Sequence, residues 1–222
     1  MPEPPRSKPP LAPKDPDLPD DLPAAEVPPK LEGVVLERRL LKNLDLSNRE
    51  ASRLELLQSR VVEVDLSGSN LTSAAARDLT ATGGSWANTR ADGARLRRVQ
   101  FENVRLTGTS LANSSIEDAT FVECRIDLAS FRFARLERVR FESCRMEEAD
   151  FYDVRFTCAV FEDCALTGAS WAGATFTRSE MRRCDLSGGM NIDRLRGVRM
   201  PWSDVINAAG DFASAVGIEI IE

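Results

Sequence analysis

Residues 131–166 read FRFARLERVRFESCRMEEADFYDVRFTCAVFEDCAL and show the pattern that decides the fold. A large apolar residue stands at every fifth position, and this spacing holds without exception from Leu96 to Leu186. The positions are Leu96, Phe101, Leu106, Leu111, Ile116, Phe121, Ile126, Phe131, Leu136, Phe141, Met146, Phe151, Phe156, Phe161, Leu166, Trp171, Phe176, Met181 and Leu186. Because only 42% of the whole chain is hydrophobic, chance does not explain the series.

A period of five fits neither regular secondary structure. On an α-helix five residues advance about 500°, so the apolar side chains would spiral around the axis and make no face. On a flat strand successive members of the series would point to opposite faces, because five is odd. The chain must therefore turn a corner every five residues, which predicts a solenoid of very short strands.

Small residues occupy a second regular position, two residues before each large one. This series runs from Ala94 to Cys184 and contains only Ala, Val, Cys, Ser and Thr. A narrow interior needs such an alternation of large and small side chains to fill without voids. The positions between are mostly polar, as expected for solvated corners.

The number of walls follows from identical residues that recur every twenty positions. Cysteines stand at 124, 144, 164 and 184, and phenylalanines stand at 101, 121, 141 and 161. If one coil takes twenty residues, each set forms a column on one wall with neighbours ~4.8 Å apart. Four pentapeptides per coil predict four walls.

Two runs resemble the A-(D/N)-L-x-x unit of pentapeptide repeat proteins: Ala149-Asp150-Phe151 and Cys184-Asp185-Leu186-Ser187-Gly188. The resemblance covers most of residues 31–200 and is most specific over 96–186. It implies an all-β fold, a right-handed four-sided parallel β-helix. The best-known members of that family protect bacterial DNA gyrase by mimicking DNA.

The flanking regions depart from the regular pattern. Residues 1–30 hold eleven of the twelve prolines, so we expect a disordered, polyproline-like tail. Within it, Pro10-Leu11-Ala12-Pro13-Lys14 resembles a ligand of proline-binding modules, but short matches of this kind are common by chance, so a solvated tail is the favoured interpretation. Residues 31–200 are expected to form the β-helix, with strands favoured at 47–60 over a short helix capped by Ser47.

Residues 72–95 are the weakest part of the repeat, because Ala76, Ala81 and Ala91 replace large residues. We expect poor coils or a protruding loop there. After Leu186 the apolar series slips by one residue, to Met190, Leu195 and Met200, and Gly188-Gly189 can absorb the slip.

Residues 201–222 are expected to cap the solenoid or to make a homodimer. The sequence predicts a helix over 203–216, with Ser203 as its N-cap. A short strand is expected from Ile218 to Ile221. Either role would cover the open end of the last coil.

No residue in the sequence is a candidate for catalysis, cofactor binding or metal binding. The chain has no histidine, which excludes Ser–His and Cys–His pairs, and it has no phosphate-binding glycine motif. Four of the five cysteines occupy the small inward position, where we expect them to act as small hydrophobic residues. Cys158 lies off the pattern and is expected to be more exposed, as a reactive thiol or as a bystander. The free cysteines favour a reducing cytoplasm, and no signal peptide or membrane span is recognisable in the sequence.

Charge decides between the functional hypotheses. The net charge is −6, but residues 61–200 carry 20 acids and 19 bases. Arginines cluster at 132–140 and acids at 142–163, which predicts either mutual pairing or a docking face. The first hypothesis is a non-enzymatic scaffold that binds an unknown protein partner. The alternative, a gyrase-protecting DNA mimic, needs about twenty net negative charges over ~40 Å of duplex axis. Binding of nucleic acid itself is disfavoured because the aromatic residues point inward.

Overall fold

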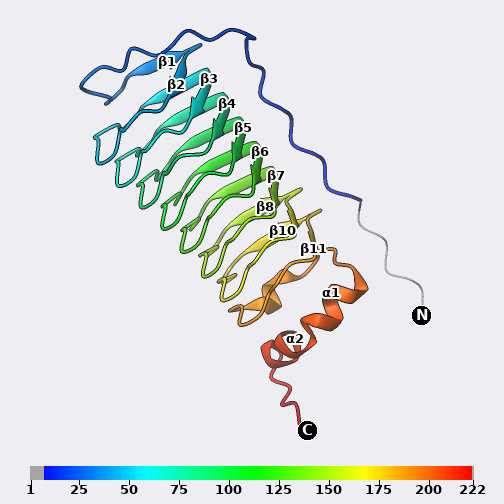
Figure 1. Ribbon diagram of the computed structural model, residues 1–222. Coiled ribbons are helices and arrows are strands. Elements are labelled where there is room, and N and C mark those ends of the chain that lie inside the picture. Colours follow the sequence, from blue (N-terminus) through cyan, green and yellow to red (C-terminus); the bar gives the residue numbers. More distant parts are fainter. Residues whose placement is uncertain (1–7, 222) are drawn as a thin grey trace.

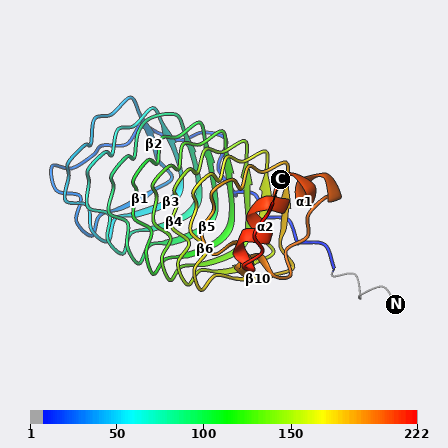
Figure 2. The same ribbon diagram turned by 90° about the horizontal axis from the view of Figure 1, so that it is seen from below.

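The chain forms a right-handed, four-sided parallel β-helix, seen from the side in Figure 1 and obliquely from below in Figure 2. The structure is a computed structural model, and it describes residues 8–221. Strand β6 (Ser115–Val122) pairs with β7 (Arg135–Glu142) so that Phe121 faces Phe141. This offset of twenty residues recurs from β1 to β11, which confirms the predicted coil length.

Each coil has four walls, which we number after one representative coil. Its inward residues are Leu136 on wall 1, Phe141 on wall 2, Met146 on wall 3 and Phe151 on wall 4, and all four are buried. The residue two positions after each inward residue takes a left-handed backbone conformation and turns the corner; Arg138, for example, has a φ of 52°. The short corner therefore aims every fifth side chain at the axis.

Walls 1 and 2 carry the strands. These are β1 (Val35–Glu37), β2 (Leu40–Lys42), β3 (Glu55–Val62), β4 (Ala75–Thr82), β5 (Arg95–Glu102), β6, β7, β8 (Arg155–Thr157), β9 (Val160–Glu162), β10 (Thr175–Thr177) and β11 (Glu180–Arg182). Strands β3 to β7 continue around the corner between the two walls. On walls 3 and 4, consecutive coils are joined by isolated β-bridges, such as the bridge between Asp150 and Ser170.

The interior is filled by stacked columns. Phe101, Phe121, Phe141 and Phe161 stack on wall 2, with centroids of consecutive rings 5.0 Å apart. The four inward cysteines are free thiols whose sulfur atoms lie near backbone carbonyls, as in the 3.4 Å contact of Cys144 Sγ with the Phe121 oxygen. They fill the role of small core residues that the sequence predicts.

Residues 47–60 and 72–95 both form regular coils. The strand prediction for 47–60 is confirmed by β3, whereas the expectation of poor coils or a loop over 72–95 is wrong. Strand β4 keeps full register, with Ala76 between Leu56 and Leu96. The backbone ladder holds the coil in shape, so the small side chains leave empty space in the core.

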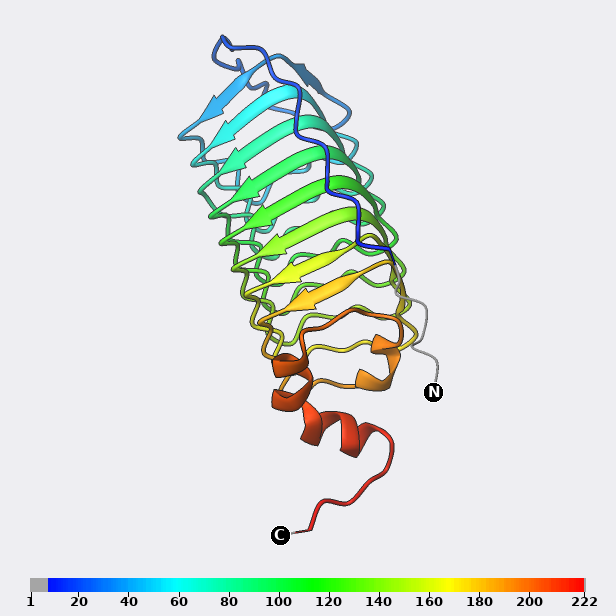
Figure 3. The same cartoon turned by 90° about the vertical axis from the view of Figure 1, so that its right-hand side faces the viewer.

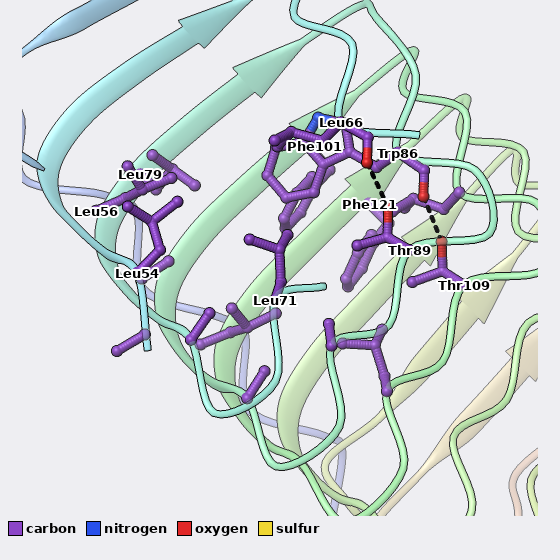
Figure 4. A pocket seen from close by; sticks show the side chains of 18 residues that line it. Leu54, Leu56, Leu66, Leu71, Leu79, Trp86, Thr89, Phe101, Thr109 and Phe121 are labelled. Atoms are coloured by element: carbon purple, nitrogen blue, oxygen red, sulfur yellow. Dashed lines mark hydrogen bonds between the residues drawn. The ribbon is translucent and has the colours of Figure 1, made fainter. Parts of the chain in front are cut away.

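That space is an apolar cavity of about 50 Å³, shown in Figure 4. Its lining includes Ala76, Ala91 and Trp86. Beside it, the hydroxyl of Thr109 donates a hydrogen bond to the Trp86 carbonyl at 2.7 Å, one of the two bonds drawn in the figure. The cavity lies where the sequence replaces large inward residues by alanine.

We expect Ala76→Leu to raise the free energy of unfolding by about 1 kcal/mol, because it fills the cavity and continues a leucine column. Urea unfolding measures the change. Ala112→Leu, an outward position on wall 4, is the control and should change stability by less than about 0.5 kcal/mol. A loss of stability in the Ala76 variant would show that the cavity cannot hold the side chain.

The N-terminal segment differs from the expected disordered tail. Residues 8–22 run as an extended chain along the outside of the solenoid, from the last coils toward the first (Figures 1 and 3). Ala24 then bridges to Leu40 of β2. Side chains on the solenoid hold the segment by hydrogen bonds to its backbone, which a composition-based expectation of disorder does not take into account. Residues 1–7 of the expected tail lie outside the described residues.

The register slip after Leu186 is real but occurs later than expected. Met190 still bridges to Ser170 at an offset of twenty and is exposed, whereas Arg199 pairs with Glu180 at an offset of nineteen. The short 3₁₀ helix η1 (Ile192–Leu195) absorbs the missing residue and buries Ile192 in place of Met190. The prediction that Met190 points inward is therefore wrong.

The C-terminal cap contains two short helices where the sequence predicts one. Helix α1 (Trp202–Asn207) and helix α2 (Ala209–Ala215) meet at Ala208, and the residue before α1 is Pro201, so Ser203 is not the cap. Ala208 is buried and Phe212 packs against the core, so the pair covers the end of the solenoid. No strand is assigned over residues 218–221, contrary to expectation.

Candidate protein-binding surface

Most of the clustered charges neutralise one another across coils. Arg138 contacts Asp118, Glu117 and Glu137, and Arg140 contacts Glu142 and Glu162. This is the mutual pairing that the sequence offered as one explanation of the clusters. Within residues 8–221 no group of three His, Cys, Asp or Glu side chains could hold a metal ion. The same residues contain no helix long and apolar enough to cross a membrane.

Leu128 and Phe133 are bulky apolar residues at corner positions, where the left-handed backbone favours Gly and Asn. Leu128 and Phe133 have φ values of 58° and 61°, yet their side chains are bulky and apolar. In the neighbouring coils the matching positions are Gly108 and Glu148 for Leu128, and Asn113 and Asp153 for Phe133. A residue with a Cβ in this conformation costs roughly 1–2 kcal/mol, and Gly and Asn are the residues that tolerate it best.

Both side chains are about half exposed, so packing offsets only part of this cost. Leu128 is 58% exposed and Phe133 is 48% exposed, at the two corners that flank wall 4. Exposed bulky residues in a strained conformation are a feature more typical of binding sites than of stabilising structure.

Aromatic and cationic groups on wall 4 join these residues into one patch. The rings of Phe133 and Tyr152 meet edge to face, with centroids 5.4 Å apart. The guanidinium of Arg132 lies over the Tyr152 ring at 4.3 Å, and its Nη1 donates to Asp150 at 2.8 Å. We call Leu128, Arg132, Phe133 and Tyr152 the ridge. Tyr and Arg are the residue types enriched at the energetic centres of protein interfaces.

A column of arginines borders the ridge on wall 1. Arg95, Arg135 and Arg155 are exposed, and Arg135 and Arg155 are in direct register on adjacent strands. No acidic oxygen of the described chain lies within ion-pair distance of any of the three. Like charges directly opposite on neighbouring strands are destabilising, so this column also favours an acidic partner.

Arg135 and Arg155 line a shallow depression next to the ridge. Phe133 and Asp153 contribute to the same depression, which lies around the corner from wall 4 to wall 1. An apolar side chain is therefore placed directly beside unpaired positive charge. A partner surface that covers both would carry apolar residues next to acids.

Two carboxyl groups lie next to Leu128 on wall 3. Burial and a hydrogen bond with Glu147 raise the pKa of Asp127 to about 6, whereas the same hydrogen bond, with help from Arg145, lowers the pKa of Glu147. With its pKa raised, the Asp127 carboxyl takes up a proton below about pH 6, while Glu147 stays ionised. Its charge is partly cancelled by Arg145, whose Nη2 lies 3.2 Å from Glu147.

In the sequence, Arg132 and Arg135 belong to a charge cluster, but the four residues of the ridge do not stand out as a group. The available signal was the residue type at corner positions, where Leu128 and Phe133 stand among residues that suit a left-handed backbone. Cys158, predicted to be exposed, is only 3% exposed and lies in the corner column beneath the N-terminal segment. That prediction is wrong because it left out the covering segment.

Comparisons with known proteins agree with the repeat architecture. The family profile "Pentapeptide repeat region" matches residues 94–171, and "Pentapeptide repeats (8 copies)" matches residues 155–189. A search of curated proteins finds no match.

Two solved structures illustrate the structural likeness. QnrB1, a plasmid-mediated fluoroquinolone resistance protein, is 19% identical, with 86% of this chain and 92% of QnrB1 covered and a TM-score of 0.40. HetL from the cyanobacterium Nostoc, a protein involved in regulation of heterocyst differentiation, is 19% identical over 78% of this chain and 93% of its own, with a TM-score of 0.30. The unbroken five-residue period, the twenty-residue coils and the matches to both repeat profiles agree that residues 94–189 of this chain are pentapeptide repeats.

Proposed function

We propose that the protein is a non-enzymatic scaffold that binds an acidic protein partner through the ridge and the adjoining arginine column. The observation that carries the proposal is the exposure of Leu128 and Phe133 in a conformation that is unfavourable for them. A rigid solenoid holds these groups in place, so binding costs little conformational entropy.

The partner's chemistry follows from the groups presented. Phe133, Tyr152 and Leu128 offer apolar contact area, while Arg135 and Arg155 offer two unpaired positive charges. A protein surface with apolar residues flanked by Asp or Glu would complement both. The alternative function, gyrase protection by DNA mimicry, requires a negative surface, and the exposed arginines on wall 1 have the opposite sign.

The double variant Leu128→Asn and Phe133→Asn is expected to gain stability and lose binding. Asparagine tolerates the left-handed corner, so the free energy of unfolding should rise by about 1 kcal/mol. Removal of two central apolar contacts should weaken partner capture by about tenfold or more. Urea unfolding and a quantitative pull-down from native lysate, read by mass spectrometry, measure the two effects.

The matched control is Val35→Asn, which removes an apolar side chain that is 54% exposed on the first coil, away from the ridge. This variant should retain the same set of captured proteins. Equal capture by wild type and by the double variant would exclude the ridge as the binding surface. A double variant that is less stable than wild type would show that the two corners are not strained.

Self-association through the C-terminal cap is a second proposal, carried by its exposed apolar residues. Trp202 is 75% exposed on α1, and Ile206, Ile218, Ile220 and Ile221 are also exposed. A homodimer would bury this surface. Sedimentation equilibrium tests the proposal, and a monomer at high protein concentration would remove it.

A further inference from the structure

The N-terminal segment lies on a charged column at the corner between walls 1 and 2. We call residues 9–22 the strap, which crosses strands β4 to β7 in Figure 3. The column beneath it repeats every twenty residues and consists of Gln58, Asp78, Arg98, Asp118, Arg138, Cys158 and Arg178. We call this column the strap groove.

The strap groove recognises the backbone of the strap. The N–H groups of Lys14 and Asp17 donate to Asp118 and Asp78 at 3.1 and 3.0 Å. In return, Arg178 Nη2 donates to the Pro9 carbonyl at 3.0 Å. Gln58 Nε2 donates to the Asp17 carbonyl at 3.4 Å. These contacts span the solenoid from its second coil to its eighth.

The spacing of the strap matches the spacing of the coils. Three residues of polyproline helix rise about 9.3 Å, and two coils rise about 9.6 Å. Lys14 and Asp17 are three residues apart, and their acceptors Asp118 and Asp78 are two coils apart. One turn of a polyproline helix therefore covers the same distance as two coils. Aspartates recur at this same interval of two coils in this part of the groove.

The prolines of the strap follow the same period. Pro10, Pro13, Pro16 and Pro19 are partly buried, whereas Leu11, Ala12, Lys14, Asp15 and Asp17 are exposed. A polyproline helix has three residues per turn, so these four prolines form the face that meets the solenoid. Each residue that donates its N–H to the groove directly follows one of these prolines: Lys14 follows Pro13, and Asp17 follows Pro16.

The groove is built to accept N–H donors in fixed positions. Asp118 is held by Arg138 Nε at 2.7 Å, and Asp78 by Arg98 Nη2 at 2.6 Å. Burial alone would raise the pKa of both aspartates, but hydrogen bonds from the arginines and from the strap lower it below the ordinary value. Both acceptors therefore remain ionised and cannot rotate away from the strap.

We propose that the strap groove is a binding site for extended Pro-x-x-Pro segments, and that residues 9–22 are its resident ligand, which a proline-rich segment of a second molecule can replace. The ligand class is a polyproline helix with a free N–H directly after each groove-facing proline. The proposal does not rest on the ridge, which lies on wall 4 and its two flanking corners.

The test uses the full chain with Lys14→Pro and Asp17→Pro. Each substitution removes a donor N–H but keeps the polyproline conformation, so the strap should leave the groove while the solenoid stays folded. The probe is a fluorescein-labelled synthetic peptide with the sequence of residues 8–24, followed by fluorescence anisotropy. The control chain carries Ala12→Pro, which removes an exposed N–H that has no acceptor among the described residues.

The labelled peptide is expected to bind the double variant about tenfold or more tightly than it binds wild type or the Ala12 control, whose own straps compete. A peptide with prolines in place of Lys14 and Asp17 should bind the double variant about tenfold or more weakly. In wild type, amide hydrogen exchange should show protection of the Lys14 and Asp17 N–H groups relative to the free peptide.

Three results would overturn the proposal. Wild-type amides at 14 and 17 that exchange as fast as those of the free peptide would show that the strap does not occupy the groove. No binding of the peptide to the double variant would show that the groove is not a site for a separate segment. Equal binding of both peptides would show that the donor N–H groups are not recognised.

Discussion

Phe141→Ala is expected to lower the free energy of unfolding by about 3–5 kcal/mol. Phe141 is fully buried, and its ring stacks between those of Phe121 and Phe161 with centroids 5.0 Å apart on both sides. The ring of Phe131 also meets it edge to face. The backbone ladder on both sides of strand β7 prevents the coil from collapsing into the space, as the cavity next to Ala76 already shows.

Urea unfolding at neutral pH measures this loss, and Phe133→Ala is the matched control. Phe133 is the same residue type eight positions earlier but points into solvent, so its truncation should change stability by less than about 1 kcal/mol. A loss below about 1 kcal/mol for Phe141→Ala would contradict the inward position of the ring. It would also contradict the rigidity of the coil.

The sequence was sufficient to predict the interior, because inward residues at a period of five leave only one way to turn the chain. Columns such as Phe101 to Phe161 and Cys124 to Cys184 appear as repeats of twenty, and the structure confirms both. The expectation of poor coils around Ala76 failed because it weighed the small side chains and Gly83-Gly84 but not the backbone ladder between coils. The ladder of backbone hydrogen bonds through β3, β4 and β5 holds that coil whatever the side chain.

The strap could not be predicted from composition, because its binding depends on residues up to 169 positions away, as between Pro9 and Arg178. A proline-rich stretch has little apolar surface of its own, so it is read as disordered. The period-three spacing of Pro10, Pro13, Pro16 and Pro19 was visible in the sequence. Its meaning required the corner column at a period of twenty, which exists only after the coils are stacked.

The candidate binding surface was only partly predictable for a related reason. Arg132 and Arg135 belong to a charge cluster in the sequence, but only the structure shows that Arg132 is paired with Asp150 while Arg135 has no acidic oxygen within ion-pair distance among the described residues. The strain at Leu128 depends on its backbone conformation. That conformation could have been assigned from the repeat frame, since corner positions recur every five residues.

Arg138→Met is expected to lower the free energy of unfolding by about 3–5 kcal/mol at pH 7. Arg138 Nε and Nη2 hold the two oxygens of Asp118 at 2.7 and 3.2 Å, and Asp118 is only 1% exposed. Methionine keeps the apolar stem of the side chain but removes the charge. The variant leaves a buried carboxylate whose remaining partner is the Lys14 N–H.

The destabilisation should depend on pH, because the Asp118 carboxyl makes wild type more stable as pH rises and makes the Arg138 variant less stable as pH rises. In wild type the pKa of Asp118 is lowered, because Arg138 and the Lys14 N–H outweigh the effect of burial. This interaction therefore stabilises the protein fully above the unfolded-state pKa, about 3.9, and is lost as pH falls through the lower folded-state pKa. Without Arg138, burial raises the pKa of Asp118, so the variant is most stable when the carboxyl is protonated and loses stability as pH rises. The difference between the proteins should be largest at pH 7 and smallest near pH 3.

Two further variants separate this ion pair from other effects of acid. Arg125→Met removes an exposed arginine that has no acidic partner in the described chain, and it should change stability by less than about 0.5 kcal/mol at every pH. Adding Asp118→Asn to the Arg138 variant removes the buried charge, so it should recover most of the loss at pH 7 and abolish its pH dependence. The loss of unfolding free energy could instead be the same at pH 3 as at pH 7, or it could remain after Asp118→Asn is added. Either result would mean that Arg138 stabilises the corner by packing. In that case the strap groove would not need an ionised Asp118 to stay folded, and the alternation of aspartate and arginine along it would have no energetic basis.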